Sequence, residues 1–451
     1  MILLRTIPGM LRRGSTWRAR CAAGAALLCC YACGSSDGNG AGASHSKRGV
    51  ILISLDTLRA DRLGCYGYER PTSPHMDALA ARGTVFENTI AEAPWTLPAH
   101  ASMLTGLFPA AHGVTRPSRR LRSGTATLAQ TLMDAGFTTI GLTEGGYLAR
   151  DYGLSQGFQI YSENRPDLAT TLDTARDLLS QVRTQAPFLM FLHTFDVHCP
   201  YDPPPEHIQW MRTDDEQAIE TADSCGVQFN EAPLTPGQVR TLSNRYDAGI
   251  HSVDALLGAF FEELQEQGVL DDIYVVITSD HGEELYEHGR IGHERTVHQE
   301  ALRVPWIVIG PDVVQGRISS SAGLTDIAPT VLDLLGVQPP DSMQGRSRAA
   351  ELRGTAHAED ELRFSELDWK TELYSVITDT HQLIVDGERR TLLRLGEPGG
   401  ETSTQEMSEL ERRYMEALQQ HLLLRTQTPA PTIDALDPDQ QERLRALGYG
   451  D

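Results

Sequence analysis

The sequence predicts an α/β protein in which a large, mostly parallel sheet is sandwiched by helices. Short continuous apolar runs of strand length recur along the chain, starting at Val50–Leu55, and such runs mark strands buried on both faces. Segments with helical periodicity lie between them, and strands alternating with helices favour a parallel sheet. The 451 residues, 40% of them hydrophobic, suffice for a large core.

The elements follow in order. Five strands are expected at Val50–Leu55, Thr138–Leu142, Phe188–Leu192, Ile273–Thr278 and Trp306–Ile309. Five helices are expected between them, at Pro74–Arg82, Leu97–Leu104, Thr127–Ala135, Leu168–Gln185 and Asn244–Gln267. In such sheets the ligand lies outside the carboxyl ends of the strands.

The pattern changes after the proline-rich turn at Val337–Asp341. A small antiparallel sheet is expected at Leu373–Thr378, Gln382–Val385 and Leu392–Leu395, followed by a helix at Gln405–Leu424. We therefore divide the chain into a leader at 1–33, a linker at 34–47, a large domain at 48–350 and a C-terminal subdomain at 351–451.

The first 33 residues carry five arginines and no acid, and they end in the apolar run CAAGAALLCCYAC. This is the shape of an export signal, and the Gly/Ser-rich linker that follows is of the flexible kind. The whole resembles a bacterial lipoprotein leader lipidated at Cys33, with Cys29 as a rival. A plain cleaved signal or an uncleaved anchor is the alternative. We expect an exported, cell-envelope protein anchored in the membrane by lipid.

The charge of the chain limits its partners. Thirty-nine Lys and Arg against 61 Asp and Glu give a formal charge of −22, which repels nucleic-acid phosphates. Sequence-independent nucleic-acid binding is not expected. After the leader only Cys65, Cys199 and Cys225 remain, and an odd number of cysteines cannot form a closed disulfide framework.

Carboxylates end two of the buried strands. Asp56 follows the first strand, and Asp280 and His281 follow the strand at Ile273–Thr278. A buried carboxylate is costly without a cation, so a divalent metal is the expected partner. Mixed oxygen and nitrogen ligands suit Zn, Mn or Fe better than Ca. The alternative is that each Asp caps a following turn or helix.

Thr96 opens the segment TLPAHASMLTG and stands at a predicted helix N-cap, with Pro98 in the first turn. Capping alone explains a threonine there. A functional interpretation is also open, because the positive end of the helix dipole favours an anion and a metal would activate the hydroxyl.

Histidines gather at two places. Four of them, His281, His288, His293 and His298, fall within 18 residues, and His193 and His198 follow the strand at 188–192. Any one of these is readily explained as a solvated or core side chain. Two groups at the ends of strands nevertheless indicate one shared site.

Six motifs occur in a characteristic order: ISLDTLRADRLGCYGY at 53–68, TLPAHASMLTG at 96–106, FDVHCPY at 195–201, SDHGE at 279–283, GHERTVHQEALRVP at 292–305 and TDIAPTVLDLLG at 325–336. In this order they resemble the sulfatases of the alkaline phosphatase superfamily. The resemblance covers residues 48–350, with a weaker match at 436–449. It implies an alkaline phosphatase/sulfatase-like fold and a sulfatase-like catalytic domain.

The resemblance also implies roles for individual residues. Asp56, Asp280 and His281 would bind the metal, and Thr96 would be the nucleophile that also touches it. His100 stands where sulfatases have an Arg that supports the nucleophile.

Two further histidines would contact the substrate. His198 matches the histidine that contacts the anionic group, and His293 lies near the position of a lysine that does the same.

The departures from the family bear on the chemistry. Sulfatases place Cys or Ser at the nucleophile position and oxidise it to formylglycine, which Thr96 cannot become. Thr57 replaces a second aspartate, and His281 replaces a common Asn. A Thr nucleophile with a His ligand is similar to the phosphodiesterase and phosphoglycerol-transferase members.

The sequence thus predicts a metal-dependent hydrolase of sulfate or phosphate (di)esters, with Zn or Mn rather than Ca. The expected substrate is an anionic ester, namely a sulfated or phosphorylated glycan, lipid or small molecule. The alternatives are a phosphoglycerol- or phosphoethanolamine-type transferase and a non-catalytic anion-binding module.

Overall fold

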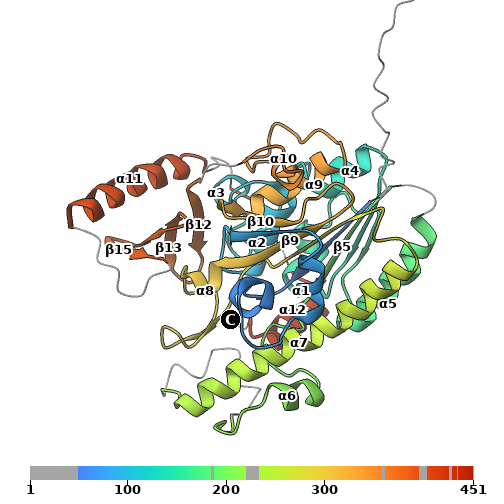
Figure 1. Cartoon of the computed structure of the whole chain (residues 1–451). Coiled ribbons are helices and arrows are strands. Elements are labelled where there is room, and N and C mark those ends of the chain that lie inside the picture. The colour runs from blue at the N-terminus through green and yellow to red at the C-terminus, as the bar shows by residue number, and fades with distance from the viewer. Residues whose placement is uncertain are drawn as a thin grey trace, which may run out of the picture. The chain divides into compact units, whose positions relative to one another are not determined.

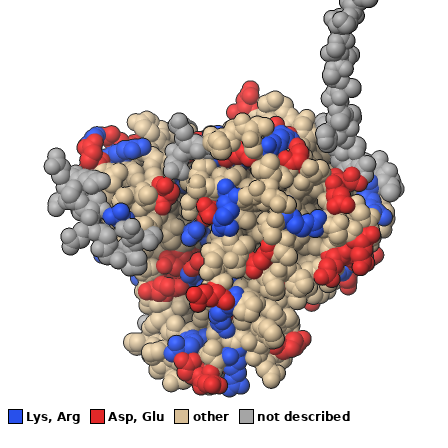
Figure 2. Space-filling model, viewed as in Figure 1, with Lys and Arg blue, Asp and Glu red and all other residues tan. Residues whose placement is uncertain are grey.

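The computed structural model describes residues 49–183, 187–219, 233–357, 361–395, 404–425, 429–433 and 435–449. The predicted leader and linker, with Cys33, lie outside the described residues. Within them, no helix is both long and apolar enough to cross a membrane. Acidic and basic side chains of the described residues are interspersed over the face shown in Figure 2.

A nine-stranded sheet forms the centre of the fold, with the order β10-β2-β9-β6-β1-β5-β3-β4 and with β11 paired to β2. Its strands are β1 (Gly49–Leu55), β2 (Thr84–Ile90), β3 (Thr138–Leu142), β4 (Ile160–Ser162), β5 (Phe188–Thr194), β6 (Tyr274–Thr278), β9 (Arg303–Ile309), β10 (Gly316–Ile318) and β11 (Ala322–Gly323). Strand β1 lies between β5 and β6 and is parallel to both, whereas β9 is antiparallel to β6 and β2. The predicted mostly parallel sheet is confirmed.

Both faces of the sheet are covered, because every residue of β1 is buried and alternate residues enter different cores. Ile51 and Ile53 pack into one core and Val50 and Leu52 into the other. The first face is covered by α1 (Pro74–Ala80), α5 (Leu168–Val182) and α7 (Pro236–Glu266), and the second by α2 (Thr96–Thr105), α4 (Leu128–Asp134), α9 (Ile327–Leu334) and α10 (Ala349–Leu352) (Figure 1).

The expected C-terminal antiparallel sheet is present, with one strand more than predicted. It consists of β12 (Arg363–Asp368), β13 (Glu372–Ile377), β14 (His381–Asp386) and β15 (Arg389–Arg394), in that order. Helix α11 (Thr404–Leu422) packs on it through Tyr414 and Leu418. A third core joins Leu367 and Leu373 of this sheet to Trp95, which precedes α2, and to Leu97 of α2. The C-terminal sheet therefore shares apolar packing with the elements that hold Thr96.

The last helix, α12 (Pro438–Ala446), returns the chain to the central sheet. Leu444 packs into the third core together with Tyr147, and Gln440 accepts a hydrogen bond from the backbone N–H of Gly146. This packing places the residues after α12 at the carboxyl end of the strands.

The remaining short elements are α3 (Pro109–His112), α6 (Pro205–Met211), α8 (Gln299–Leu302) and the two-stranded ribbon β7 (Glu284–Leu285) and β8 (Ile291–Gly292). The ribbon follows the SDHGE motif and connects it to the second half of the histidine-rich segment. It therefore carries the chain from His281 to His293.

Candidate active site

The carboxylates at the strand ends meet at one edge of the sheet. Asp56 follows β1, and Asp280 and His281 follow the adjacent parallel strand β6. All three side chains are fully buried. His281 Nε2 lies 3.3 Å from Asp280 Oδ2 and 3.7 Å from Asp56 Oδ1. The structure thus brings together the three residues that the sequence proposed as metal ligands.

Thr96 is the first residue of α2 and points its hydroxyl at this group. The hydroxyl donates to Asp56 Oδ2 at 3.4 Å and lies 3.4 Å from His281 Nε2. The expected N-cap position is wrong by one residue: Trp95, which is extended, holds it, and no side-chain cap hydrogen bond forms. Since Thr96 does not cap the helix, its burial beside two potential metal ligands needs another explanation.

The group has the properties of a cation site. Asp56 Oδ1 and Asp280 Oδ2 are buried without a hydrogen-bond partner. Burial raises the pKa of both carboxyls, and repulsion from Asp280 and Glu283 raises that of Asp56 further. Such shifts are expected where buried carboxylates crowd together, and a cation bound between them would offset the shifts. The residues present therefore fit a divalent metal.

The protonation of His281 suits ligation. Its Nδ1–H donates to the carbonyl of Gly282 at 2.9 Å, which leaves the Nε2 lone pair facing Asp56, Asp280 and Thr96. Burial lowers the pKa of this imidazole well below its ordinary value, so the ring is neutral. A neutral imidazole oriented through its other nitrogen is the usual form of a histidine ligand.

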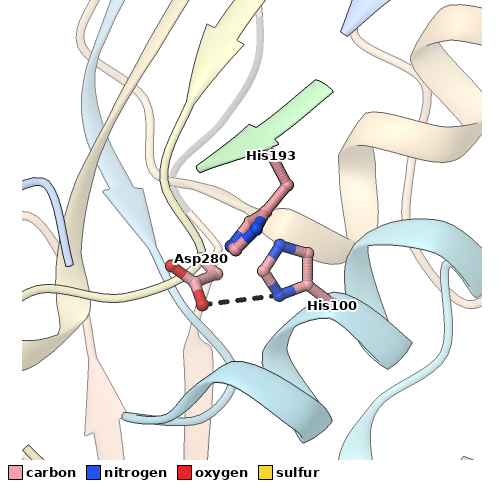
Figure 3. Close-up of side chains that lie close together, drawn as sticks. All are labelled: His100, His193 and Asp280. Atoms are coloured by element: carbon pink, nitrogen blue, oxygen red, sulfur yellow. Dashed lines mark ion pairs between the residues drawn. The ribbon is translucent and has the colours of Figure 1, made fainter. Parts of the chain in front are cut away.

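Two further histidines surround the carboxylates. Figure 3 shows His100 from α2 and His193 from β5 lying together beside Asp280. His100 Nδ1 is 2.9 Å from the Thr96 carbonyl and 3.4 Å from Asp280 Oδ2, and Nε2 is 3.0 Å from Ser54 Oγ. His100 thus joins the backbone of Thr96 to Asp280.

The contact made by His193 was not predicted. Its Nε2–H donates to Asp56 Oδ2 at 3.1 Å, and the side chain is fully buried. The sequence placed it at the end of a strand without giving it a partner. The available signal was its position beside β1, because β5 and β1 end at the same edge.

His198 and His293, which the resemblance gave as substrate contacts, lie together near Thr96. Their rings are 5.2 Å apart, and both Nε2 atoms lie 3.1 Å from the hydroxyl oxygen of Tyr449. That oxygen is also 3.2 Å from Thr96 Oγ1. Three side chains separated by up to 197 residues, from Thr96 to His293, therefore converge on one oxygen atom.

Tyr449 was missed by sequence reasoning. It lies three residues after α12 and is placed by ring packing on Tyr147, at a centroid distance of 4.7 Å. The only signal was the weak family resemblance of 436–449. The Tyr449 oxygen lies about 3 Å from Thr96 Oγ1 and from two imidazole nitrogens, which is the spacing that an anion's oxygen would have from these imidazoles once they are protonated.

Each of the two imidazoles that face Tyr449 is held in place by a hydrogen bond from its Nδ1 atom. His198 Nδ1 donates to the Cys199 carbonyl at 2.6 Å, and His293 Nδ1 to Glu283 Oε1 at 2.8 Å. Burial first, and for His198 the neighbouring His293, lowers the pKa of each to about 3. Both rings are therefore neutral, and their Nε2 atoms, which face Tyr449, can accept a hydrogen bond. They can donate one only after the ring has taken up a proton.

His198 also lines a cavity of about 960 Å³ that opens beside the site. Most of the charged side chains that line this cavity are acidic, among them Glu144, Asp196 and Glu442. Leu447, in the segment between α12 and Tyr449, also lines it. The cavity offers room for the organic part of a ligand whose anionic group reaches His198.

A comparison with models of protein families identifies the family of this chain. The family model described as Sulfatase matches residues 48–337. This chain belongs to the sulfatase family. The match includes Asp56, Asp280 and His281, as well as Thr96 and both histidines that face Tyr449.

Individual relatives are distant. An "Ulvan-active sulfatase" from Formosa agariphila is 23% identical over 336 residues, which cover 66% of this chain and 64% of that protein. The chain thus matches less than two thirds of that sulfatase's length.

Solved structures in the same fold cover more of the chain. A protein solved with its substrate D-glucosamine-2-N,6-O-disulfate matches 85% of this chain and 99% of its own, with a TM-score of 0.71 and 19% identity. The phosphonate monoester hydrolase SpPMH from Silicibacter pomeroyi matches 86% and 100%, with a TM-score of 0.69 and 20% identity. These structures confirm the sulfatase-like fold predicted from the sequence.

Proposed function

We propose that this protein is a metal-dependent hydrolase of phosphate or sulfate esters in which Thr96 is the nucleophile. The observation that carries the proposal is the position of the Tyr449 oxygen, within 3.2 Å of Thr96 Oγ1 and within 3.1 Å of His198 and His293. A nucleophile and two anion-binding groups that share one oxygen position are what an in-line displacement needs. A complete site argues against a non-catalytic module.

The residues of the site have different roles in the proposed hydrolysis. The Thr96 oxygen attacks phosphorus or sulfur, so that a new bond forms between Oγ1 and that atom, and the bond from that atom to the oxygen of the leaving alcohol breaks. The proton that Thr96 gives up ends on the leaving alcohol, and water then cleaves the Thr96 ester, which releases the acid product and restores the Thr96 hydroxyl. His198 and His293, protonated in the complex, donate to the non-bridging oxygens, and the Glu283 carboxylate stabilises charge on His293.

Asp56, Asp280, His281 and the Thr96 hydroxyl would hold the metal. When bound, a divalent metal lowers the pKa of a hydroxyl and neutralises charge that develops on the transferred group. His281 Nε2 lies 3.3 Å from Asp280 Oδ2, 3.7 Å from Asp56 Oδ1 and 3.4 Å from Thr96 Oγ1, and Thr96 Oγ1 lies 3.4 Å from Asp56 Oδ2. The edge of a tetrahedral zinc site is about 3.3 to 3.4 Å. The imidazole ligand favours Zn or Mn over Ca, which prefers oxygen.

The unmodified threonine favours phosphorus over sulfur as the attacked atom. A threonine phosphate ester is hydrolysed by water, whereas a threonine sulfate ester lacks the aldehyde route by which formylglycine releases sulfate. The structural likeness to a phosphonate monoester hydrolase supports a phosphorus substrate, and the sulfatase relatives support a sulfate substrate. We therefore rank phosphate and phosphonate esters first.

A parallel assay tests the proposal. The purified protein, reconstituted with Zn or Mn, is offered the 4-nitrophenyl esters of sulfate, phosphate, phenylphosphonate and a phosphodiester. Turnover of a phosphorus ester that exceeds sulfate turnover supports the ranking, and faster sulfate turnover reverses it. Absence of turnover on every ester, in protein that carries metal, contradicts the hydrolase proposal.

We also propose that the protein is exported and held at the membrane by a lipid on Cys33. The leader supports this, as does the disulfide-bonded state of Cys199, because disulfides persist in oxidising compartments. The substrate would then be met in the cell envelope.

A further inference from the structure

We propose a second metal site, for Zn²⁺, formed by Glu284, His288, His298 and Glu300. Two of the four clustered histidines, His281 and His293, belong to the candidate active site. The other two form a separate group with carboxylates. This proposal does not depend on the proposed hydrolase function.

The potential ligand atoms already lie close together. His288 Nε2 is 3.4 Å from Glu300 Oε2 and 4.0 Å from Glu284 Oε1. The rings of His288 and His298 stack at a centroid distance of 3.8 Å. One ligand atom from each of His288, His298 and Glu300 can be chosen so that all lie within 4.8 Å of one another. Small side-chain rotations would bring them to zinc spacing.

Glu284 gives an independent indication of a cation site. It lies in β7 and is 2% exposed, and its Oε1 is buried without a hydrogen-bond partner. That oxygen is the one aimed at His288 Nε2. A buried carboxylate facing a second carboxylate and an imidazole is stabilised by a cation between them.

The donor set selects the metal. A closed tetrahedral zinc site uses four protein ligands, and imidazole nitrogens and carboxylate oxygens are among the atoms that bind zinc. Here two imidazoles and two carboxylates would supply the four. The two carboxylates supply a charge of −2, which a divalent ion neutralises, although Arg290 and Arg295 line the same cavity of about 440 Å³.

The ion would fix the segment that delivers His293 to the active site. Glu284 follows Glu283, which accepts the hydrogen bond from His293. His288 and His298 flank His293 in the chain, five residues to either side. Zinc at this position therefore ties together both ends of the segment 284–300 and acts as a structural clamp.

Zinc stoichiometry tests the proposal in the full chain. After equilibration with Zn²⁺ and removal of free ion, we expect the double variant His288→Ala/His298→Ala to bind one equivalent less than wild type. The same difference is expected in the Asp280→Asn background, where the active-site ion is weakened. Failure of the active-site proposal alone leaves the His288-dependent equivalent in place.

Controls separate specific binding from general loss of imidazoles. His207 and His251 also form a pair, with Nδ1 atoms 2.7 Å apart, but no carboxylate is paired with them among the described contacts. His207→Ala/His251→Ala should keep the wild-type stoichiometry. Glu300→Gln, which preserves shape, should lose the equivalent without loss of fold by circular dichroism. Equal zinc content in wild type and in the His288→Ala/His298→Ala protein would overturn the proposal.

Discussion

The hydroxyl oxygen of Tyr449 lies 3.2 Å from Oγ1 of Thr96, across 353 residues of sequence. It occupies the point where an oxygen of the transferred group would be bound. Tyr449→Phe removes this competing hydroxyl and keeps the ring packed on Tyr147. We expect inorganic phosphate or vanadate to bind about 5- to 10-fold more tightly, since about 1 kcal/mol of competing hydrogen bonding is removed. Calorimetric titration measures this.

The matched control is Tyr152→Phe, whose hydroxyl is buried without a partner outside the site. Its anion affinity should equal that of wild type. Weaker anion binding in Tyr449→Phe would mean that the hydroxyl binds the substrate rather than standing in its place.

The active-site metal is expected to depend on Asp280. Asp280→Asn should lose about one equivalent of Zn or Mn, because one charged ligand of a buried site is replaced by a neutral amide. Metal analysis by mass spectrometry measures the loss. Stoichiometric Ca without any transition metal, or unchanged metal in Asp280→Asn, would refute the assigned ligand set.

Stability should depend on pH through Glu144. Burial first, and repulsion from Asp196 second, raise the pKa of this carboxyl to about 8, against about 4.3 in an unfolded chain. Between these values the folded state holds a proton that the unfolded state has lost, so stability falls as pH rises, by up to about 1.4 kcal/mol per pH unit.

Glu144→Gln should remove this part of the dependence. Urea unfolding of wild type and variant at pH 5.5 and pH 8 measures it, with Glu262→Gln, an exposed residue of α7, as control. Parallel stability curves for wild type and Glu144→Gln would show that Glu144 does not carry the effect.

Lipidation is expected at Cys33. Cys33→Ser should move the protein from the membrane fraction to the soluble fraction, whereas Cys29→Ser should not. Intact mass of the mature protein should show an acylated cysteine at position 33 as its first residue. A mature start elsewhere without acyl mass would leave an exported protein without an anchor.

Strand ends were the most informative feature of the sequence. Asp56 and Asp280 could be paired in advance because parallel strands end at one edge of a sheet. Strand β2 was missed because Glu87 and Asn88 interrupt its apolar run. The antiparallel direction of β9 could not be predicted, since an apolar run such as Trp306–Ile309 carries no information about direction.

Contacts made by residues near the end of the chain could not be predicted from the sequence. Tyr449 reaches Thr96 only because α12 packs on Gly146 and Tyr147, and no local pattern encodes that docking. The position of Thr96 shows a second limit on prediction from the sequence, which is local rather than long-range. A one-residue difference at the start of α2 changes a cap into a buried hydroxyl, and helix boundaries are not predictable to one residue.

The central claim is that Thr96 is an unmodified nucleophile. Thr96→Ala should lose at least about 10³-fold in kcat/KM, while Thr96→Ser keeps much of the activity, because removing a nucleophile leaves the electrostatics of the site in place. A helix cap would instead cost about 1 kcal/mol of stability and little rate.

The most direct measurement is mass spectrometry of protein quenched during turnover of a phosphorus ester. The account predicts a peptide containing Thr96 that carries the added phosphoryl or phosphonyl mass, absent from Thr96→Ala and from protein without substrate. Modification of a different residue, or wild-type turnover by Thr96→Ala, would contradict it.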